Sequence, residues 1–426
     1  MRAFLAVAFV AACHFTPSHE ASPDAGPTSG DAGPDAPTGC PAGHAGDGCV
    51  LGLYDAAASC DAAAVAKLQA ELATHAEPLW AGGRAMFVTA SPIGVAGDWN
   101  GWQPTVVTAA FCQASVNLAV TDVPSGFHTY KLVDGATWSL DPKNAAFAYD
   151  DYTGNADHAN SVLDTPDSGK GHLVHLDQAC STALGNCRDV YAYLPPAYDA
   201  DEKPYPVLFM HDGQNLWDDH TCCFGHTGWE INVTLDSEIA AGKVKPIVVI
   251  GAASTINRNN EYGLDAATTA AFEQFQVTEL QPHALAQVRW DGGKLAIAGS
   301  SLGGLMAMEL ALRHPDVYGA TASLSGAFWP GMDTHDALRD HFATIGKQAL
   351  AMYLDSGGAL ADDSDGAADT AEIRDMAVGF GWQRADSPAC TPGPNNVCYY
   401  LDAGATHDEL AWKARAWRFL EFLFPA

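Results

Sequence analysis

The 426-residue sequence contains no apolar run as long as the roughly 18 residues that a membrane-spanning helix needs. Basic residues are scarce, with 21 Lys and Arg against 51 Asp and Glu, which gives a formal net charge of −30. Nucleic acids and anionic membrane surfaces attract positive patches, so a chain this acidic is not expected to bind either of them. No set of Cys and His residues has the spacing of zinc ligands, and we expect no metal or other cofactor.

The N-terminus has the features of an export signal. Arg2 supplies one positive charge, and residues 3–12 form a short apolar core. The core ends in Val-Ala-Ala-Cys at residues 10–13, which resembles the site where bacterial lipoproteins are cleaved and acylated on the cysteine. We therefore expect residues 1–13 to be a lipoprotein signal and Cys13 to carry a lipid anchor, at the outer membrane of the cell envelope. The alternative is an ordinary secretory signal and a secreted protein.

Cysteine is well represented, with 11 residues in the chain. Apart from Cys13 an even number remains, as is typical of compartments where disulfides persist. Two pairs flank short loops and predict the disulfides Cys180–Cys187, across a hairpin, and Cys390–Cys398. The adjacent Cys222 and Cys223 bond either to other cysteines or to each other.

Composition divides the chain into segments. Residues 14–48 are rich in Pro, Gly, Ala, Asp and Ser, which predicts an extended tether. Residues 49–81 predict a short helical segment, with one amphipathic helix over 60–76. Residues 82–165 alternate short β-like runs with turns and predict a small all-β sandwich. The rest of the chain, residues 170–426, has a different pattern.

The β-rich segment carries two aromatic motifs, Asp-Trp-Asn-Gly-Trp at 98–102 and Tyr-Lys-Leu-Val-Asp-Gly at 130–135. They resemble motifs of early-set, immunoglobulin-like domains found in starch-active enzymes and glycogen-binding modules, and the same module precedes some siderophore esterases. The resemblance implies an immunoglobulin-like sandwich. Trp99, Trp102 and Trp138 either stack on sugar rings or pack in the core of the sandwich.

From residue 170 onward apolar strand patterns alternate with helical ones. Strands are expected at 188–194, 205–210, 246–250, 295–298, 349–354 and 398–401. Helices are expected at 232–241, 268–285, 302–313, 370–380 and 409–423. This alternation predicts an α/β fold with a mostly parallel sheet and helices on both faces, in which ligands bind at the carboxyl ends of the strands.

Residues 299–303 read Gly-Ser-Ser-Leu-Gly, between a short apolar strand pattern and a helix pattern that stops at His314-Pro315. A strand, a tight turn and a helix in this order are typical of a nucleophile elbow, in which flanking glycines leave the central side chain free. Ser301 is therefore the candidate nucleophile. The alternative is a glycine-rich turn that packs a helix on a sheet.

A serine nucleophile needs a base and an acid behind that base, and in this architecture they follow in the order acid, then His. His407 lies in the loop between the last predicted strand and the last helix, so it is the candidate base. The loop after the strand at 349–354 holds the candidate acid Asp365. The alternative acids in that loop are Asp363 and Asp362. A calcium loop is a rival use of this segment, but alanine stands at its first ligand position.

The oxyanion formed by ester attack needs backbone N–H groups as donors. The residue after the nucleophile, Leu302, supplies one, and the loop after the strand at 205–210 supplies the other through Gly213 or Gln214. Four aromatic residues are candidates for an acyl or aryl pocket, with core packing as the alternative: Trp217, Trp229, Phe328 and Trp329.

Five ordered motifs carry a family resemblance: Met-His-Asp-Gly-Gln-Asn-Leu-Trp-Asp at 210–218, Arg258 with Glu261-Tyr262, Gly-Ser-Ser-Leu-Gly-Gly at 299–304, Tyr-Leu-Asp-Ser-Gly at 353–357 and Gly-Ala-Thr-His-Asp-Glu-x-x-Trp at 404–412. Together they resemble the esterase-D-like esterases, which include enterochelin, feruloyl and acetyl-xylan esterases and the mycolyl transferases. The resemblance covers about residues 170–426. It implies an α/β-hydrolase fold with Ser301 and His407 as nucleophile and base. It leaves the acid open, because the stretch from Gly358 to Asp365 is longer than the usual short turn.

These features predict an exported serine esterase that acts on an acylated polysaccharide or a siderophore-type ester. One alternative is acyl transfer to a sugar alcohol by the same Ser-His-Asp triad, because water and alcohol differ only as the second acceptor. Another is a surface lipoprotein that binds glycan and whose hydrolase domain is inactive. The sequence does not determine the oligomeric state.

Overall fold

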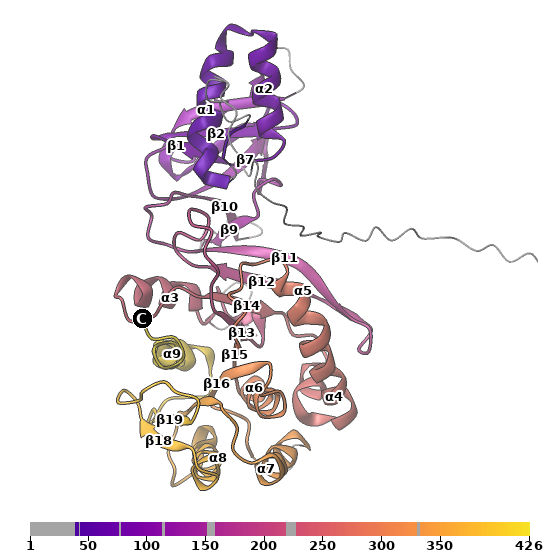
Figure 1. Ribbon diagram of the computed structural model, residues 1–426, viewed down its shortest axis with the longest axis vertical. Coiled ribbons are helices and arrows are strands. Elements are labelled where there is room, and N and C mark those ends of the chain that lie inside the picture. Colours follow the sequence, from indigo (N-terminus) through magenta and orange to yellow (C-terminus); the bar gives the residue numbers. More distant parts are fainter. Residues whose placement is uncertain are drawn as a thin grey trace, which may run out of the picture. The chain divides into compact units, whose positions relative to one another are not determined.

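A mostly parallel β-sheet forms the C-terminal part of the protein in the computed structural model (Figure 1). The structure describes residues 39–41, 43–75, 78–112, 116–150, 158–218, 227–329 and 333–426. The expected signal with its anchor on Cys13, the tether up to residue 38 and the cysteines 222 and 223 lie outside these ranges. Among the helices of the described residues, none has the length and apolar character that crossing a bilayer requires.

The sheet has the α/β-hydrolase arrangement that the sequence predicts. Its parallel strands are, in spatial order, β18 (Gln383–Asp386), β19 (Asn396–Leu401), β17 (Ala351–Ser356), β16 (Tyr318–Leu324), β15 (Leu295–Ser300), β13 (Val207–Met210) and β14 (Val248–Ala252). The antiparallel strands β12 (Asn186–Leu194) and β11 (His172–Ser181) continue it. The sequence analysis missed β11, β16 and β18.

The strands are buried on both faces, as expected of a parallel sheet. In β13, Val207 and Phe209 point into one hydrophobic cluster, while Leu208 and Met210 point into another. Helices that contribute to the first cluster are α4 (Ala266–Phe275), α5 (Gln281–Leu285), α6 (Leu302–Arg313), α7 (Asp333–Ile345) and α8 (Ala367–Gly379). Those that contribute to the second are α3 (Ile231–Ala240) and α9 (Glu409–Leu423).

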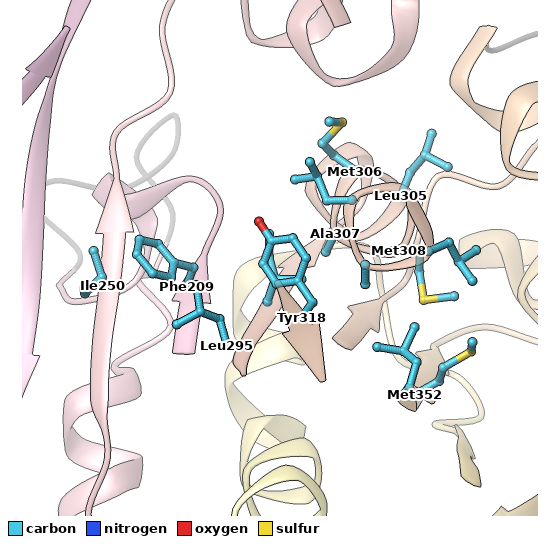
Figure 2. Packing of buried hydrophobic residues seen from close by; sticks show 14 of the residues in the cluster. Phe209, Ile250, Leu295, Leu305, Met306, Ala307, Met308, Tyr318 and Met352 are labelled. Atoms are coloured by element: carbon cyan, nitrogen blue, oxygen red, sulfur yellow. The ribbon is translucent and has the colours of Figure 1, made fainter. Parts of the chain in front are cut away.

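Helix α6 begins directly after the candidate nucleophile and is buried along almost its whole length. Every residue from Leu302 to Leu312 is buried, and Figure 2 shows Met308 on the side of the helix that faces Met352 of β17. Burial of each large apolar side chain contributes roughly 1.5–3 kcal/mol, so this packing fixes the helix firmly against the sheet. The position of its first turn is therefore fixed as well.

The N-terminal β-strands belong to two sheets that face each other, a separate four-stranded sheet and a continuation of the large sheet, which β11 extends by pairing antiparallel with β9 (Ala146–Tyr149). One sheet contains β1 (Leu79–Ala81), β2 (Arg84–Thr89), β6 (Asn117–Asp122) and β5 (Ala109–Ala110). Opposite lie β3 (Gly94–Gly97), β4 (Val106–Val107), β7 (Phe127–Asp134), β8 (Thr137–Ser139), β9 and β10 (Ala159–Asp164). Phe87, Val95 and Tyr130 are buried between the two sheets. The immunoglobulin-like relationship of this sandwich stays a prediction.

Helices α1 (Asp47–Ala56) and α2 (Ala62–Leu72) cover the other face of β2, where Met86 and Val88 pack with Leu51 and Leu68. Strand β2 is therefore buried on both faces. A 3₁₀ helix already begins at Gly43, so the expectation that the tether runs to residue 48 is wrong at its C-terminal end.

The tryptophans of the sandwich differ in exposure. Trp99 stacks against Phe87 with ring centroids 5.8 Å apart, so it packs onto the core. Trp102 is half-buried, whereas Trp138 on β8 is 43% exposed and does not pack in the core. Of the three side chains, Trp138 is the one most accessible to a ligand.

Both predicted loop-closing disulfides are present, and Cys180–Cys187 lies in the hairpin between β11 and β12 as expected. Two further disulfides were not predicted from the sequence, Cys40–Cys49 and Cys60–Cys112. The second of these links the end of the α1 segment to the β-sandwich across 52 residues.

The disulfides should stabilise the protein more when the loop that they close is longer, with a logarithmic dependence on loop length. A chain-entropy argument gives about 4 kcal/mol for the 52-residue separation of Cys60–Cys112 and about 2 kcal/mol for the 7-residue separation of Cys180–Cys187. We expect paired Cys→Ala variants to lose unfolding free energy in that order in urea titrations. A larger loss at Cys180–Cys187 would contradict the argument.

Candidate active site

Ser301 occupies a strained turn between β15 and α6. Its backbone angles are φ 54° and ψ −127°, a conformation that non-glycine residues rarely adopt. The glycines beside it are required by space, because a Cβ on Gly299 would lie 2.6 Å from the backbone of Gly303. The Ser301 N–H donates to the carbonyl of Leu324 at 3.0 Å, which ties the turn to β16. The local backbone thus has the geometry expected of a nucleophile elbow.

His407 and Asp365 meet beyond the carboxyl ends of β19 and β17. The Nδ1 atom of His407 lies 2.5 Å from Oδ1 of Asp365. The Asp365 side chain is 2% exposed and the His407 side chain 35%, so a buried carboxylate supports a ring that reaches solvent. Because β15, β16, β17 and β19 are parallel neighbours, their carboxyl ends bring this pair to the same sheet edge as Ser301.

The two alternative acids lie elsewhere in the loop. Asp362 accepts hydrogen bonds from the hydroxyl and the N–H of Ser364, and these bonds lower the pKa of Asp362. Asp363 accepts from the N–H of Ala368 at 2.8 Å in the first turn of α8. Of the three candidate acids, the structure brings Asp365 to His407.

A short segment after β16 connects the two halves of the site. The N–H of Ala327 donates to the carbonyl of Ser301 at 3.0 Å. Farther along, the ring of Trp329 lies 6.3 Å from that of His407 in an edge-on arrangement. Residues 326–329 therefore contact both the serine turn and the histidine loop.

The candidate oxyanion loop after β13 packs against the first turn of α6. A Cβ on Gly303 would lie 3.1 Å from Oδ2 of Asp212, so this loop and the N-terminus of α6 approach closely. Gly213 in turn packs on the backbone of Gly251, where a Cβ would lie 2.4 Å away. The loop that contains the two candidate donors is thus held against the helix that begins at Leu302.

Arg258, which has no role assigned from sequence, holds that loop in place. Its guanidinium forms two hydrogen bonds to the carboxylate of Asp212, at 2.6 and 2.7 Å. Burial opposes the charge, but attraction to Asp212 raises the pKa of Arg258. Gln214 adds a second clamp, since its amide exchanges hydrogen bonds with the hydroxyl and the N–H of Ser254.

The prediction of an aromatic pocket is wrong for three of its four residues. Trp217 and Trp229 are each 2% exposed and Phe328 is 0% exposed, because they pack in the hydrophobic core behind the site. Trp329 is half-buried and next to His407, so it is the one that remains available to a substrate. Aromatic side chains bury large apolar areas, so core packing accounts for these three residues.

The part of the chain that contains the candidate site matches a known family. Residues 181–418, more than half of the chain, match the family described as "Putative esterase", so the protein belongs to that esterase family. The resemblance inferred from the five motifs is therefore confirmed.

Individual relatives are more distant. A 176-residue segment is 26% identical to an endo-1,4-beta-xylanase/feruloyl esterase of Xylanibacter ruminicola, over 39% of this chain and 23% of that protein. Another comparison gives 31% identity over 174 residues with an iron(III) enterobactin esterase of Dickeya dadantii, over 40% of this chain and 36% of that protein. A solved ferulic acid esterase is similar with a TM-score of 0.46 and 20% identity, over 59% of this chain and 98% of that one. The chain spans between 23% and 56% of the length of the first curated relatives.

His211, which begins the candidate oxyanion loop after β13, should make the protein sensitive to acid. Burial lowers the pKa of His211 from 6.5 to about 4, so its protonation opposes folding. A lowered pKa contributes stability that is complete above pH 6.5 and is lost as the pH falls towards 4. Over that window we expect the unfolding free energy to decrease by about 3 kcal/mol more in the wild type than in His211→Gln. Parallel curves from chemical denaturation would contradict this expectation, and the less buried His283→Gln serves as the control.

Proposed function

We propose that the protein is an exported serine carboxylic-ester hydrolase. The observation that carries the proposal is the 2.5 Å contact between His407 and the buried Asp365, at the sheet edge where Ser301 occupies a strained turn. Membership of an esterase family supports the same reaction class.

In the proposed reaction Ser301 attacks the ester carbonyl while His407 removes the proton from its hydroxyl. The N–H of Leu302, together with that of Gly213 or Gln214, stabilises the negative oxygen of the tetrahedral intermediate. The protonated His407 then donates to the departing alcohol, which leaves an acyl group on Ser301. Water, activated by His407, releases the acid in the second step. Asp365 orients the imidazole and balances its charge throughout.

We propose an acylated polysaccharide or a siderophore-type ester as the substrate class. The names of two relatives, a feruloyl esterase and an iron(III) enterobactin esterase, support substrates of these two kinds, of which the first carries an aromatic feruloyl group. Trp329, half-buried beside His407, offers an aromatic face to such a group. Trp138 on the β-sandwich is exposed enough to contact a glycan, which is the basis for proposing a glycan-linked substrate.

Export is proposed from two features. The described residues contain four disulfides, which persist in oxidising compartments. The Val-Ala-Ala-Cys sequence at residues 10–13 supports lipid attachment at Cys13.

Replacement of the nucleophile tests the function directly. We expect Ser301→Ala to lower turnover of a p-nitrophenyl ester by as much as about 10⁶-fold, because no other group in the site attacks the carbonyl. The variant should keep the wild-type melting temperature.

A panel of feruloyl, acetyl-sugar and catecholate esters, with alcohol acceptors added, distinguishes hydrolysis from acyl transfer. Full activity of Ser301→Ala would refute the assignment, and no turnover with firm glycan binding would favour a binding protein.

The three aspartates of the loop provide matched tests of the acid. Asp365→Asn should reduce kcat by about 10⁴-fold, because the amide stabilises the wrong tautomer of His407. Asp362→Asn and Asp363→Asn remove carboxylates that bond only within the loop and at the start of α8, so their kcat should stay within a few-fold of the wild type. Equal and mild effects at all three positions would mean that the acid lies elsewhere.

A further inference from the structure

Ser325 is a buried serine with strained backbone, directly after β16. It is 0% exposed, and its φ of 45° lies in the left-handed region that costs non-glycine residues roughly 1–2 kcal/mol. Its N–H donates to the carbonyl of Asp355 at 2.8 Å, which holds the residue in this conformation. Strain of this kind persists where surrounding contacts require a side chain in one position.

The hydrogen bonds around Ser325 have only one consistent direction. Its Oγ receives the Nε1–H of Trp412 at 3.0 Å and an Nη2–H of Arg415 at 2.6 Å, and both of these groups can only donate. The single hydroxyl proton of Ser325 is therefore left for Oδ2 of Asp365, which is 2.5 Å away. Arg415 donates to the Ser325 hydroxyl, and this polarises the hydroxyl. The hydroxyl in turn donates a strengthened hydrogen bond to the Asp365 carboxylate.

The two oxygens of the Asp365 carboxylate have different neighbours. Oδ2 receives the Ser325 hydroxyl and the N–H of Gly357, while Oδ1 faces Nδ1 of His407. Two donors on Oδ2 stabilise the ionised form of Asp365, and an ionised Asp365 places the proton of the contact with His407 on Nδ1. The other ring nitrogen of His407 then keeps the lone pair that a base requires.

We propose that Ser325 is a positioning residue which, with Arg415 behind it, keeps Asp365 ionised and thereby fixes the tautomer of His407. This inference rests on the proposed function, in which His407 is the base. It adds to that function a chain of contacts from α9 through the end of β16 to the triad, and it assigns Ser325 and Arg415 a role in setting the pH range of activity.

The charges around this network support the assignment. Arg415 is 2% exposed at its side chain and lies 3.0 Å from Asp355 and 3.8 Å from Asp365. Burial raises the pKa of Asp355 to about 6, although Arg415 opposes the shift. The guanidinium of Arg415 lies closer to Asp355 than to Asp365, so two buried carboxylates share its charge, and Ser325 provides the direct hydrogen bond from this network to Asp365. The remaining titratable groups of the network are Asp402, 3.9 Å from Arg415, and Tyr353, bonded to Asp355.

The test is the pH dependence of kcat/KM in Ser325→Ala. Without the hydroxyl, negative charge on Asp365 is less stabilised and holds a proton on the His407–Asp365 pair more strongly. We expect the acid limb of the profile to move up by about half to one pH unit, with kcat about 10-fold or more below wild type and KM changed little. Arg415→Lys keeps the charge but not the planar fork and should give a smaller shift of the same sign.

Ser323→Ala is the matched control. Ser323 is a buried serine near the end of β16, two residues before Ser325, and its hydroxyl makes no hydrogen bond in the described structure. The pH profile of Ser323→Ala should therefore overlay that of the wild type. An unshifted acid limb in Ser325→Ala would overturn the proposal even if activity fell.

A second measurement separates this inference from the proposed function. NMR of the Ser301→Ala protein, with and without Ser325→Ala, follows the pH at which the His407 ring takes up a proton and needs no activity. An upward shift with Ser325→Ala supports the positioning role. The same midpoint in both proteins refutes it, whatever the activity assays of Ser301→Ala show about the reaction.

Discussion

The buried carboxylate of Asp365 is the interaction on which the arrangement of the site depends. It joins side chains that follow two strands and one that lies on a helix: Ser325 after β16, His407 after β19 and Arg415 on α9. An ionised carboxylate removed from water is stable only when its oxygens are satisfied, and here every partner comes from a different element. The parallel pairing of β16, β17 and β19 therefore supports the site, because it brings the segments that follow these strands to one edge of the sheet.

Backbone strain is concentrated at the same edge of the sheet. Asp212, Ser301, Ser325 and Asp365 follow β13, β15, β16 and β17, and their φ angles are 59°, 54°, 45° and 58°. Each of four adjacent strands is thus followed by a non-glycine residue in the left-handed region, within ten residues of its end. The deep burial of α6 supplies stabilisation that offsets this local cost, so a rigid core supports a strained edge.

Sequence patterns predicted the parts of this protein that are encoded locally. Helix α6 begins and ends where the Gly-Ser-Ser-Leu-Gly turn and His314-Pro315 indicate, because both signals act within a few residues. Asp365 was favoured from its place in its loop, and the structure brings that residue rather than its neighbours to His407. The catalytic roles of Ser301, His407 and Asp365 stay predictions.

What the sequence did not reveal depends on contacts between distant segments. Strand β16 reads Tyr-Gly-Ala-Thr-Ala-Ser-Leu and lacks the run of β-branched residues that identifies a strand, so Ser325 at its end had no context. Arg415 looks like a solvent-facing charge on an amphipathic helix. Its burial requires Asp355 and Asp365 from two other segments, which no local pattern can indicate.

Strand β2 has a consequence for how the N-terminal part could be divided. Its side chains alternate between the helical pair and the opposite sheet, and Cys60–Cys112 crosses the same boundary. A fragment that begins at residue 82 would expose the apolar face of β2 that the helices cover, and Cys112 would lack its disulfide partner Cys60. The helices and the sandwich therefore cannot be separated at residue 82, and because β9 of the sandwich pairs with β11, residues 40–426 form one compact unit.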